Sequence, residues 1–174
     1  VNSAEATRKR AAEASEDVEH LSTHAATAKA YLKAIRPHQW LKNILIFLPM
    51  LAAHQIDGPH FFTSLMAFLS FSLVASSVYV LNDLLDLDAD RAHPRKCKRP
   101  FASGAIPISA GTWMAAALLA LGAGIAAFIG PWFFLVMTVY YGLTTAYSLA
   151  LKKRMILDIC VLAGLYTIRI VAGG

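Results

Sequence analysis

Residues 61–81 form a run without charge, whose polar residues are Ser and Thr. A helix needs about 20 apolar residues to cross the hydrocarbon core of a bilayer, so this run predicts a membrane-spanning helix. Residues 107–129 and 132–151 form two more runs of this kind, and residues 155–174 form a further apolar run that carries Asp158 and Arg169. With 57% hydrophobic residues and a mean hydropathy of +0.52 over 174 residues, the sequence predicts an all-α integral membrane protein.

The first apolar segment is shorter than the others. Residues 44–53 are too few to cross a bilayer, so we expect their helix to extend back through Trp40, Lys42 and Asn43. The sequence thus predicts a polytopic transmembrane helical bundle with about five spans. Lys42 would either snorkel to the interface or face a cavity, whereas Asn43 is too short to snorkel and favours a polar cavity. Residues 1–30 are polar and are expected to form a cytoplasmic tail or linker before a membrane domain at residues 31–174.

Positive charge gathers in three parts of the chain. Of the sixteen Lys and Arg residues, fifteen lie in residues 1–42, 91–99 or 152–154. In a five-span chain these parts lie on one side, which the positive-inside rule places in the cytoplasm. The net charge of +5 therefore reflects membrane topology, and we expect contact with membrane lipids and no nucleic-acid partner.

Cys97 and Cys160 fall in a cytoplasmic loop and in a span, so no disulfide is expected between them.

Four aspartates and five cationic residues follow the first long apolar run. At about 100° per residue, Asp83, Asp86 and Asp90 fall within roughly 60° of one another on a helix, while Asp88 points away and Asn82 flanks the face. Three carboxylates on one face repel one another unless a cation compensates them. The pattern therefore predicts either a divalent metal or pairing with the arginines that follow. The alternative is a solvated loop of mixed charge, which the helical register of the carboxylates disfavours.

The cations after the aspartates suit a phosphate ligand. Arg95, Lys98 and Arg99 could hold phosphate oxygens, Arg through a planar fork and Lys as a point charge. Since Mg²⁺ takes one or two carboxylates together with phosphate oxygens of a substrate, the whole cluster suits a diphosphate. The alternative for these cations is attraction to anionic lipid headgroups.

Asp158 lies near the start of the last apolar run. It either lines the polar site or is stabilised by the dipole at a helix N-terminus. It stands about 16 Å along its helix from Arg169, which is too far for the two side chains to pair.

One known family shares this residue order. The first aspartate-rich signature of the UbiA superfamily of intramembrane prenyltransferases resembles, in order, Asn82, Asp83, Asp86, Asp90, Arg95, Arg99, Pro100 and Gly104. The resemblance implies a lipid-open helical bundle that binds Mg²⁺ and a diphosphate on its cytoplasmic side. It implies metal-binding and catalytic roles for Asp83, Asp86 and Asp90, with Asn82 among the substrate-binding residues.

Two other segments narrow the resemblance. RPHQWLKN at residues 36–43 and YSLALKKRMILDI at residues 147–159 look most like the branch that includes decaprenyl-phosphate phosphoribosyltransferase, and like bacterial proteins in which a phosphatase-like domain precedes the membrane part. This similarity implies substrate-binding roles for Tyr147 and Lys152. Members of the family have a nine-helix fold and a second aspartate-rich loop, which this sequence lacks. We therefore expect either the amino-terminal half of a longer protein or a chain completed by another subunit.

The resemblance implies a transferase in a bacterial inner membrane. Its substrates would be a polyprenyl lipid and a diphosphate-bearing co-substrate, with Mg²⁺ assisting the departure of diphosphate. Transfer of phosphoribosyl from phosphoribosyl diphosphate to polyprenyl phosphate is favoured by the segment at residues 36–43. Prenyl transfer to an aromatic acceptor such as 4-hydroxybenzoate is the alternative, and a cation-binding transporter or assembly subunit without enzymatic activity is a third possibility.

Overall fold

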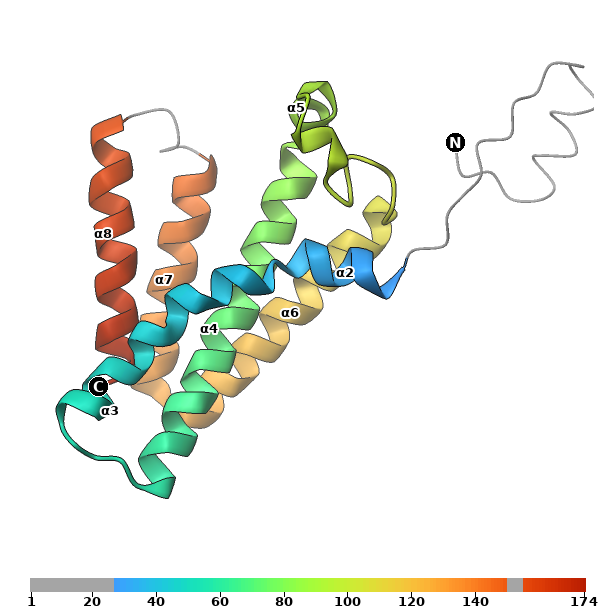
Figure 1. The fold of residues 1–174 in the computed structure, drawn as a ribbon. Coiled ribbons are helices and arrows are strands. Elements are labelled where there is room, and N and C mark those ends of the chain that lie inside the picture. Colours follow the sequence, from blue (N-terminus) through green and yellow to red (C-terminus); the bar gives the residue numbers. More distant parts are fainter. Residues whose placement is uncertain (1–26, 150–154) are drawn as a thin grey trace, which may run out of the picture.

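The computed structural model describes residues 27–149 and 155–174, and this part of the chain is helical without any strand (Figure 1). The elements follow one another along the chain as α2 (Ala28–Ile35), η1 (Pro37–Phe47), α3 (Leu48–Ala52), α4 (Gly58–Leu85), α5 (Leu87–Ala92), η2 (Lys96–Lys98), α6 (Ile108–Ile129), α7 (Pro131–Leu149) and α8 (Met155–Ala172). The all-α class predicted from the sequence is confirmed.

The first apolar segment does not form the single helix that we expected. It is divided into α2, the 3-10 helix η1 and α3, with a sharp turn at Arg36, where φ is 52° and ψ is 58°. Pro37 disfavours a right-handed helical conformation at the residue before it, so α2 must end there. A left-handed conformation costs a residue with a side chain about 1–2 kcal/mol. Two contacts of the Arg36 guanidinium offset this cost: an ion pair with Asp83 at 2.6 Å and a cation–π contact with Tyr79 at 5.3 Å.

Helix α4 is the longest element and starts from a capped end. Asp57 accepts a hydrogen bond from the backbone N–H of His60 at 2.9 Å, and Pro59 occupies the first turn, where its missing N–H costs nothing. That hydrogen bond lowers the pKa of Asp57.

Among the described residues, two helices are long and apolar enough to cross a membrane, Gly58–Leu85 and Ile108–Ile129. The five spans predicted from the sequence thus stay a prediction.

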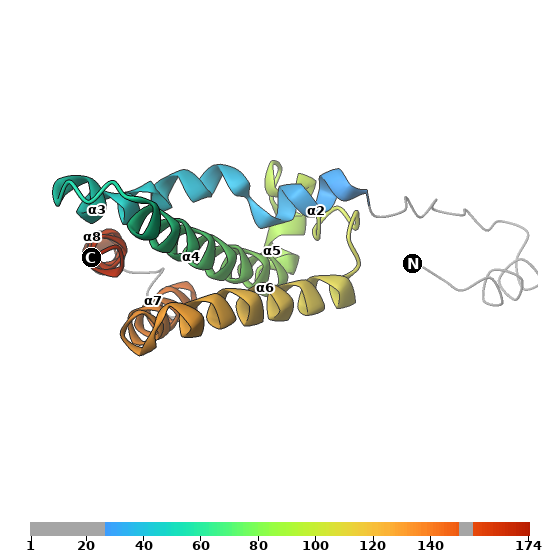
Figure 2. The ribbon, with the colours of Figure 1, turned by 90° about the horizontal axis from the view of Figure 1, so that it is seen from below.

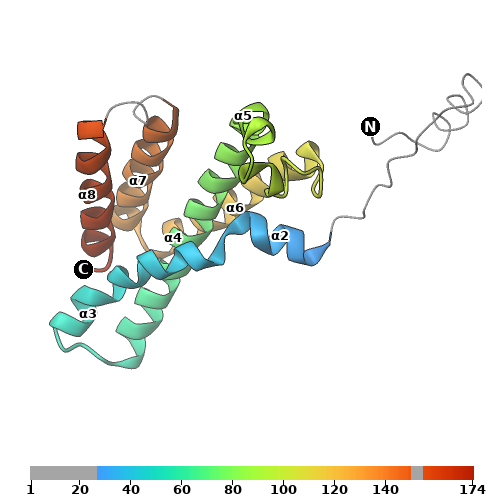
Figure 3. The same cartoon turned by 45° about the horizontal axis from the view of Figure 1, so that its top comes forward.

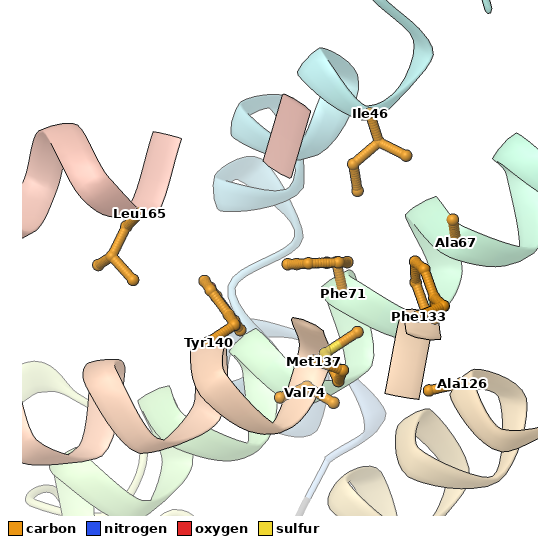
Figure 4. Packing of buried hydrophobic residues seen from close by; sticks show 9 residues of the cluster. All are labelled: Ile46, Ala67, Phe71, Val74, Ala126, Phe133, Met137, Tyr140 and Leu165. Carbon is orange, nitrogen blue, oxygen red and sulfur yellow. The ribbon is translucent and has the colours of Figure 1, made fainter. Parts of the chain in front are cut away.

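The described elements form layers around α4. Seen from below, α4 lies between a layer of α2, η1 and α3 and a layer of α6 and α7 (Figure 2). Helices α7 and α8 stand side by side, and α5 continues α4 beyond its upper end (Figure 3). The larger core cluster joins η1, α4, α6, α7 and α8 through Ile46, Ala67, Phe71, Val74, Ala126, Phe133, Met137, Tyr140 and Leu165 (Figure 4).

Helices α4 and α6 approach each other closely along a line of small residues. A Cβ added to Gly122 would lie 2.7 Å from Val74 Cγ2 and 3.0 Å from the Ser70 carbonyl oxygen. Two serines of α4 donate hydrogen bonds to backbone carbonyls of α6: Ser70 to Gly122 at 2.7 Å and Ser77 to Ala115 at 2.8 Å. These contacts fix α4, and with it the acidic cluster at its end, against α6.

The sequence predicts close packing for five small residues of this helix, and the structure separates them. Ala115 and Gly122 are buried against α4, whereas Ala116, Ala117 and Gly124 are exposed. For these three the described residues offer no packing partner, because composition alone does not tell which face of an apolar helix meets a neighbouring helix of the same chain.

We expect Gly122→Ala to lower the thermal stability of the protein, because the added methyl group meets backbone atoms of α4 that cannot move aside. Overpacking of this kind costs about 1–3 kcal/mol, against a gain in helix propensity of up to about 1 kcal/mol. Gly124→Ala is the matched control, since its new Cβ has no neighbour within 4 Å and only the gain applies. Thermal unfolding of the purified protein in detergent compares the two variants. A Gly122→Ala variant as stable as Gly124→Ala would contradict the close helix approach.

Candidate active site

The acidic cluster keeps its helical register across the junction of α4 and α5. The backbone N–H of Asp86 donates to the Asn82 carbonyl at 2.9 Å, and that of Asp90 donates to the Asp86 carbonyl at 2.8 Å. Asn82, Asp86 and Asp90 therefore follow one another at intervals of one helical turn. Asp88 is exposed, as its position in the register predicts.

Two of the aspartates are buried and share one arginine. Asp83 is 3% exposed and Asp90 is 1% exposed. Arg99 Nη1 lies 2.6 Å from Asp90 Oδ2 and 3.2 Å from Asp83 Oδ1, and Arg36 Nη2 lies 2.6 Å from the same Asp83 oxygen. Of the two outcomes that the sequence left open, pairing with arginine is therefore the one observed for Asp83 and Asp90. Asp83 ties α4 to the turn at Arg36 and to the loop after α5.

One carboxylate oxygen of the cluster has no hydrogen-bond partner. Asp90 Oδ1 is buried and accepts no hydrogen bond, and its ion-pair partner Lys96 Nζ lies 4.0 Å away. In the part of the chain that the structure describes, no three His, Cys, Asp or Glu side chains are grouped to hold a metal ion. Mg²⁺ needs only one or two protein carboxylates when a substrate supplies phosphate oxygens. Asp90, with Asp86 one turn away, fits that requirement, whereas Asp83 is held by two arginines.

The basic loop after α5 is anchored by apolar side chains. Phe101 and Ile106, each 1% exposed, pack with Ala34, Val80 and Ala115 in a second core cluster. Lys33 Nζ also donates to the Lys98 carbonyl at 3.1 Å. This anchoring turns Arg99 and Lys96 toward Asp90.

The predicted phosphate ligands of this loop differ in position. The side chains of Arg95 and Lys98 are exposed, whereas that of Arg99 is 28% exposed and contacts the two buried aspartates. Arg95 and Lys98 therefore remain accessible to a ligand at the surface.

A cavity of about 140 Å³ lies between η1, α4, α7 and α8. Its lining includes the two predicted site residues Lys42 and Tyr147, and Asn82, through which it adjoins the row of aspartates. Ser148 donates a hydrogen bond to Asn82 Oδ1, which joins the end of α7 to α4. The full lining is Lys42, Ala75, Val78, Tyr79, Asn82, Tyr140, Thr144, Tyr147, Leu165, Tyr166 and Arg169.

Asn43 lies behind the cavity wall and joins three elements. Its side chain is 1% exposed, its Nδ2 donates to Ser72 Oγ at 3.0 Å, and its Oδ1 accepts from Arg169 Nε at 2.8 Å. Asn43 thus links η1, α4 and α8, and reaches the cavity only through Arg169. Lys42, its neighbour, lines the cavity and is exposed.

Two predicted site residues fall where the structure gives no side chain. Lys152 lies outside the described residues, and Asp158 lies in α8 at a position where only the backbone is described. Their substrate-binding roles stay predictions.

Sequence reasoning missed three site residues: Arg36, Lys96 and Arg169. Arg36 lies in the segment at residues 36–43 and Lys96 in the basic stretch at residues 91–99. The sequence therefore gives their charge, but it does not give the aspartates that they contact. Arg169 was recognised as a charge in a span, yet its neighbours lie up to 126 residues away in the chain, and no local pattern reveals them.

Comparison with known proteins places the chain among intramembrane transferases. The model of the UbiA prenyltransferase family matches residues 43–174. The decaprenyl-phosphate phosphoribosyltransferase of Mycobacterium tuberculosis is 40% identical over 153 residues, which cover 82% of this chain and 49% of the relative. The nodulation protein NoeC of Azorhizobium caulinodans is 42% identical over 143 residues, covering 82% of this chain and 47% of the relative. The chain thus spans about half the length of these curated relatives.

A solved structure agrees with the sequence comparison. A UbiA homologue from Archaeoglobus fulgidus, bound to GPP and Mg²⁺, superposes with a TM-score of 0.69 at 25% identity. The match covers 83% of this chain and 52% of that protein.

Proposed function

The chain belongs to the UbiA prenyltransferase family, a family of transferases, and we propose that the protein transfers a group from a diphosphate-bearing donor to a polyprenyl lipid. The observation that carries the proposal is the buried Asp90 oxygen without a hydrogen-bond partner. It belongs to a row of polar residues whose first member, Asn82, lines a cavity with two cationic side chains. An enzyme that expels diphosphate needs hard oxygen ligands for a metal and nearby cations for the leaving group. Membership of a transferase family removes the transporter alternative.

The favoured reaction is phosphoribosyl transfer from phosphoribosyl diphosphate to a polyprenyl phosphate. It is supported by the 40% identity to decaprenyl-phosphate phosphoribosyltransferase. A prenyl diphosphate with an aromatic acceptor is the second candidate, since the solved homologue binds GPP with Mg²⁺. Both reactions break a bond between carbon and the oxygen of a diphosphate.

The residues of the acidic row divide into two roles. Asp86 and Asp90, supported by Asn82, would hold Mg²⁺. This assignment differs from the three-aspartate face predicted from the sequence, because Asp83 forms ion pairs with two arginines. Asp83 instead fixes Arg36 and Arg99 in place. When bound, the ion would neutralise charge that develops on the departing diphosphate.

The remaining residues orient the substrates. Lys96 and Arg99, turned toward Asp90, would hold Asp90 in position and lie beside the outer phosphate oxygens, while Arg95 and Lys98 bind from the surface. An oxygen of the acceptor phosphate forms a bond to the anomeric carbon of the ribose, the carbon–oxygen bond to diphosphate breaks, and the electron pair leaves with diphosphate. The attacking oxygen is already anionic, so no general base is required.

We also propose that the site faces the cytoplasm from a bacterial inner membrane. Fifteen of the sixteen Lys and Arg residues lie in the parts of the chain that a five-span topology puts on one side. The acidic row and the basic loop are on that side.

The activity is tested by diphosphate release. With Mg²⁺, phosphoribosyl diphosphate and polyprenyl phosphate, the purified protein is expected to release diphosphate, and omission of either substrate should abolish the release. Release only from a prenyl diphosphate with 4-hydroxybenzoate would move the protein to the aromatic branch. No release from either pair would contradict the transferase proposal.

A further inference from the structure

The guanidinium of Arg169 is held in one orientation by three elements. Nε donates to Asn43 Oδ1 at 2.8 Å, Nη1 to the Leu165 carbonyl at 2.6 Å, and Nη2 to the Tyr140 hydroxyl at 3.1 Å. The Tyr140 and Tyr166 rings lie 5.2 and 5.5 Å from its central carbon. A guanidinium has five N–H groups, so two are left without a protein acceptor in the described part of the chain.

The charge of Arg169 has no counter-charge within the described residues. Its side chain is 6% exposed, its three acceptors are neutral, and none of the ion pairs of the described carboxylates includes it. A buried cation is costly unless an anion compensates it. Tyrosine rings and neutral oxygens reduce that cost only in part, so an arginine in this setting favours a bound anion.

The cavity beside Arg169 has the charge and the groups to receive an anion. Its charged lining residues, Lys42 and Arg169, are both cationic, and no carboxylate lines it within the described residues. Thr144 and Tyr147 also line it. With about 140 Å³, it has room for several water molecules or for one phosphate group.

We infer that Arg169 and Lys42 form a phosphate monoester site, separate from the diphosphate site at Asp86 and Asp90. Asn82 belongs to both regions, because it lines the cavity and stands one turn before Asp86. A monoester in the cavity would therefore lie next to the departing diphosphate. The assignment to a substrate rests on the proposed function, which offers two monoesters: the phosphate of the lipid acceptor and the ribose 5-phosphate of the donor.

Asn43→Asp tests the site while keeping the shape of the side chain. The new carboxylate would lie where the amide oxygen now accepts from Arg169 Nε, and Ser72 can donate its hydroxyl hydrogen to it. The variant thus gives Arg169 an internal counter-charge, and we expect its thermal stability to be retained. Gln55→Glu is the matched control, because it adds the same charge at an exposed residue outside this cavity.

The first measurement is equilibrium binding of farnesyl phosphate without Mg²⁺, so that the aspartate row does not contribute. We expect Asn43→Asp to weaken binding by roughly 10–100-fold, the range of charge-assisted hydrogen bonds, and Gln55→Glu to leave it unchanged. Lys42→Gln, at an exposed side chain that does not affect folding, should weaken it by up to about fivefold. The second measurement is the KM of each substrate. A higher KM for polyprenyl phosphate assigns the site to the acceptor, and a higher KM for phosphoribosyl diphosphate assigns it to the donor.

Unchanged affinity and unchanged KM values in a stably folded Asn43→Asp protein would overturn the inference, as would a wild-type protein that binds neither farnesyl phosphate nor phosphoribosyl diphosphate. If the wild type binds farnesyl phosphate yet releases no diphosphate, the anion site stands and the proposed function fails.

Discussion

Replacing Asp90 with Asn is expected to slow diphosphate release by roughly 100-fold or more at a fixed Mg²⁺ concentration. The metal's charge stabilisation of a phosphoryl oxygen is worth several kcal/mol, and each 1.36 kcal/mol is a factor of ten in rate. Asp90 Oδ1 is the buried oxygen without a hydrogen-bond partner in the cluster, so replacing the carboxylate with an amide would remove a ligand of the proposed metal. The same loss is expected for Asp86→Asn. The rate of diphosphate release, measured against Mg²⁺ concentration, should show a higher metal requirement in both variants.

Asp88→Asn is the matched control, because Asp88 is exposed and lies off the row of Asn82, Asp86 and Asp90. It should retain the wild-type rate and metal dependence. The amide in Asp90→Asn still offers an oxygen to Arg99, so the fold should persist, which thermal unfolding checks. An Asp90→Asn protein with the wild-type rate and the same Mg²⁺ midpoint would rule out a metal at this position.

Arg99→Gln is expected to produce the largest loss of stability. Arg99 contacts Asp83 and Asp90, which are 3% and 1% exposed. Without it, Asp90 is left with Lys96 at 4.0 Å. Breaking a buried ion pair costs about 3–5 kcal/mol, and the lower end, about 3 kcal/mol, applies because the Arg99 side chain is 28% exposed. Thermal unfolding in detergent should show a midpoint several degrees lower, together with a loss of activity.

Arg91→Gln provides the control for this change. Arg91 is exposed in the same acidic and basic region, so its loss should alter stability by no more than about 0.5 kcal/mol. Arg99→Lys, which keeps the charge but loses the planar fork, should fall between the two. Equal stability of Arg99→Gln and Arg91→Gln would show that the two buried aspartates do not depend on Arg99.

The long helices were predictable because local composition determines them. Residues 61–81 were expected to be helical and lie within α4 (Gly58–Leu85), and residues 107–129 correspond closely to α6 (Ile108–Ile129). In both cases an uninterrupted apolar run is bounded by Pro, Gly or charged residues. The register of the aspartates was also predictable, since it depends only on helical periodicity.

The contacts that organise the site were not predictable from local patterns. Asp83 meets Arg36 across 47 residues, and the turn that allows this uses a left-handed conformation that a residue with a side chain rarely adopts. The sequence therefore suggested three equivalent aspartates, whereas tertiary packing gives Asp83 two arginine partners. The same limit applies to Asn43, whose partner Arg169 lies 126 residues further along the chain.

The 3-10 winding of η1 has a geometric consequence for the first segment of the chain. A 3-10 helix rises about 2.0 Å per residue, against about 1.5 Å for an α-helix. Over the 11 residues of η1 and the 5 residues of α3, the contour length is about 30 Å, whereas the same residues in an α-helix would extend about 24 Å. The hydrocarbon layer of a bilayer is about 30 Å thick. As an α-helix, this segment would be shorter than that thickness, whereas the 3-10 winding of η1 extends its contour length to about the same value.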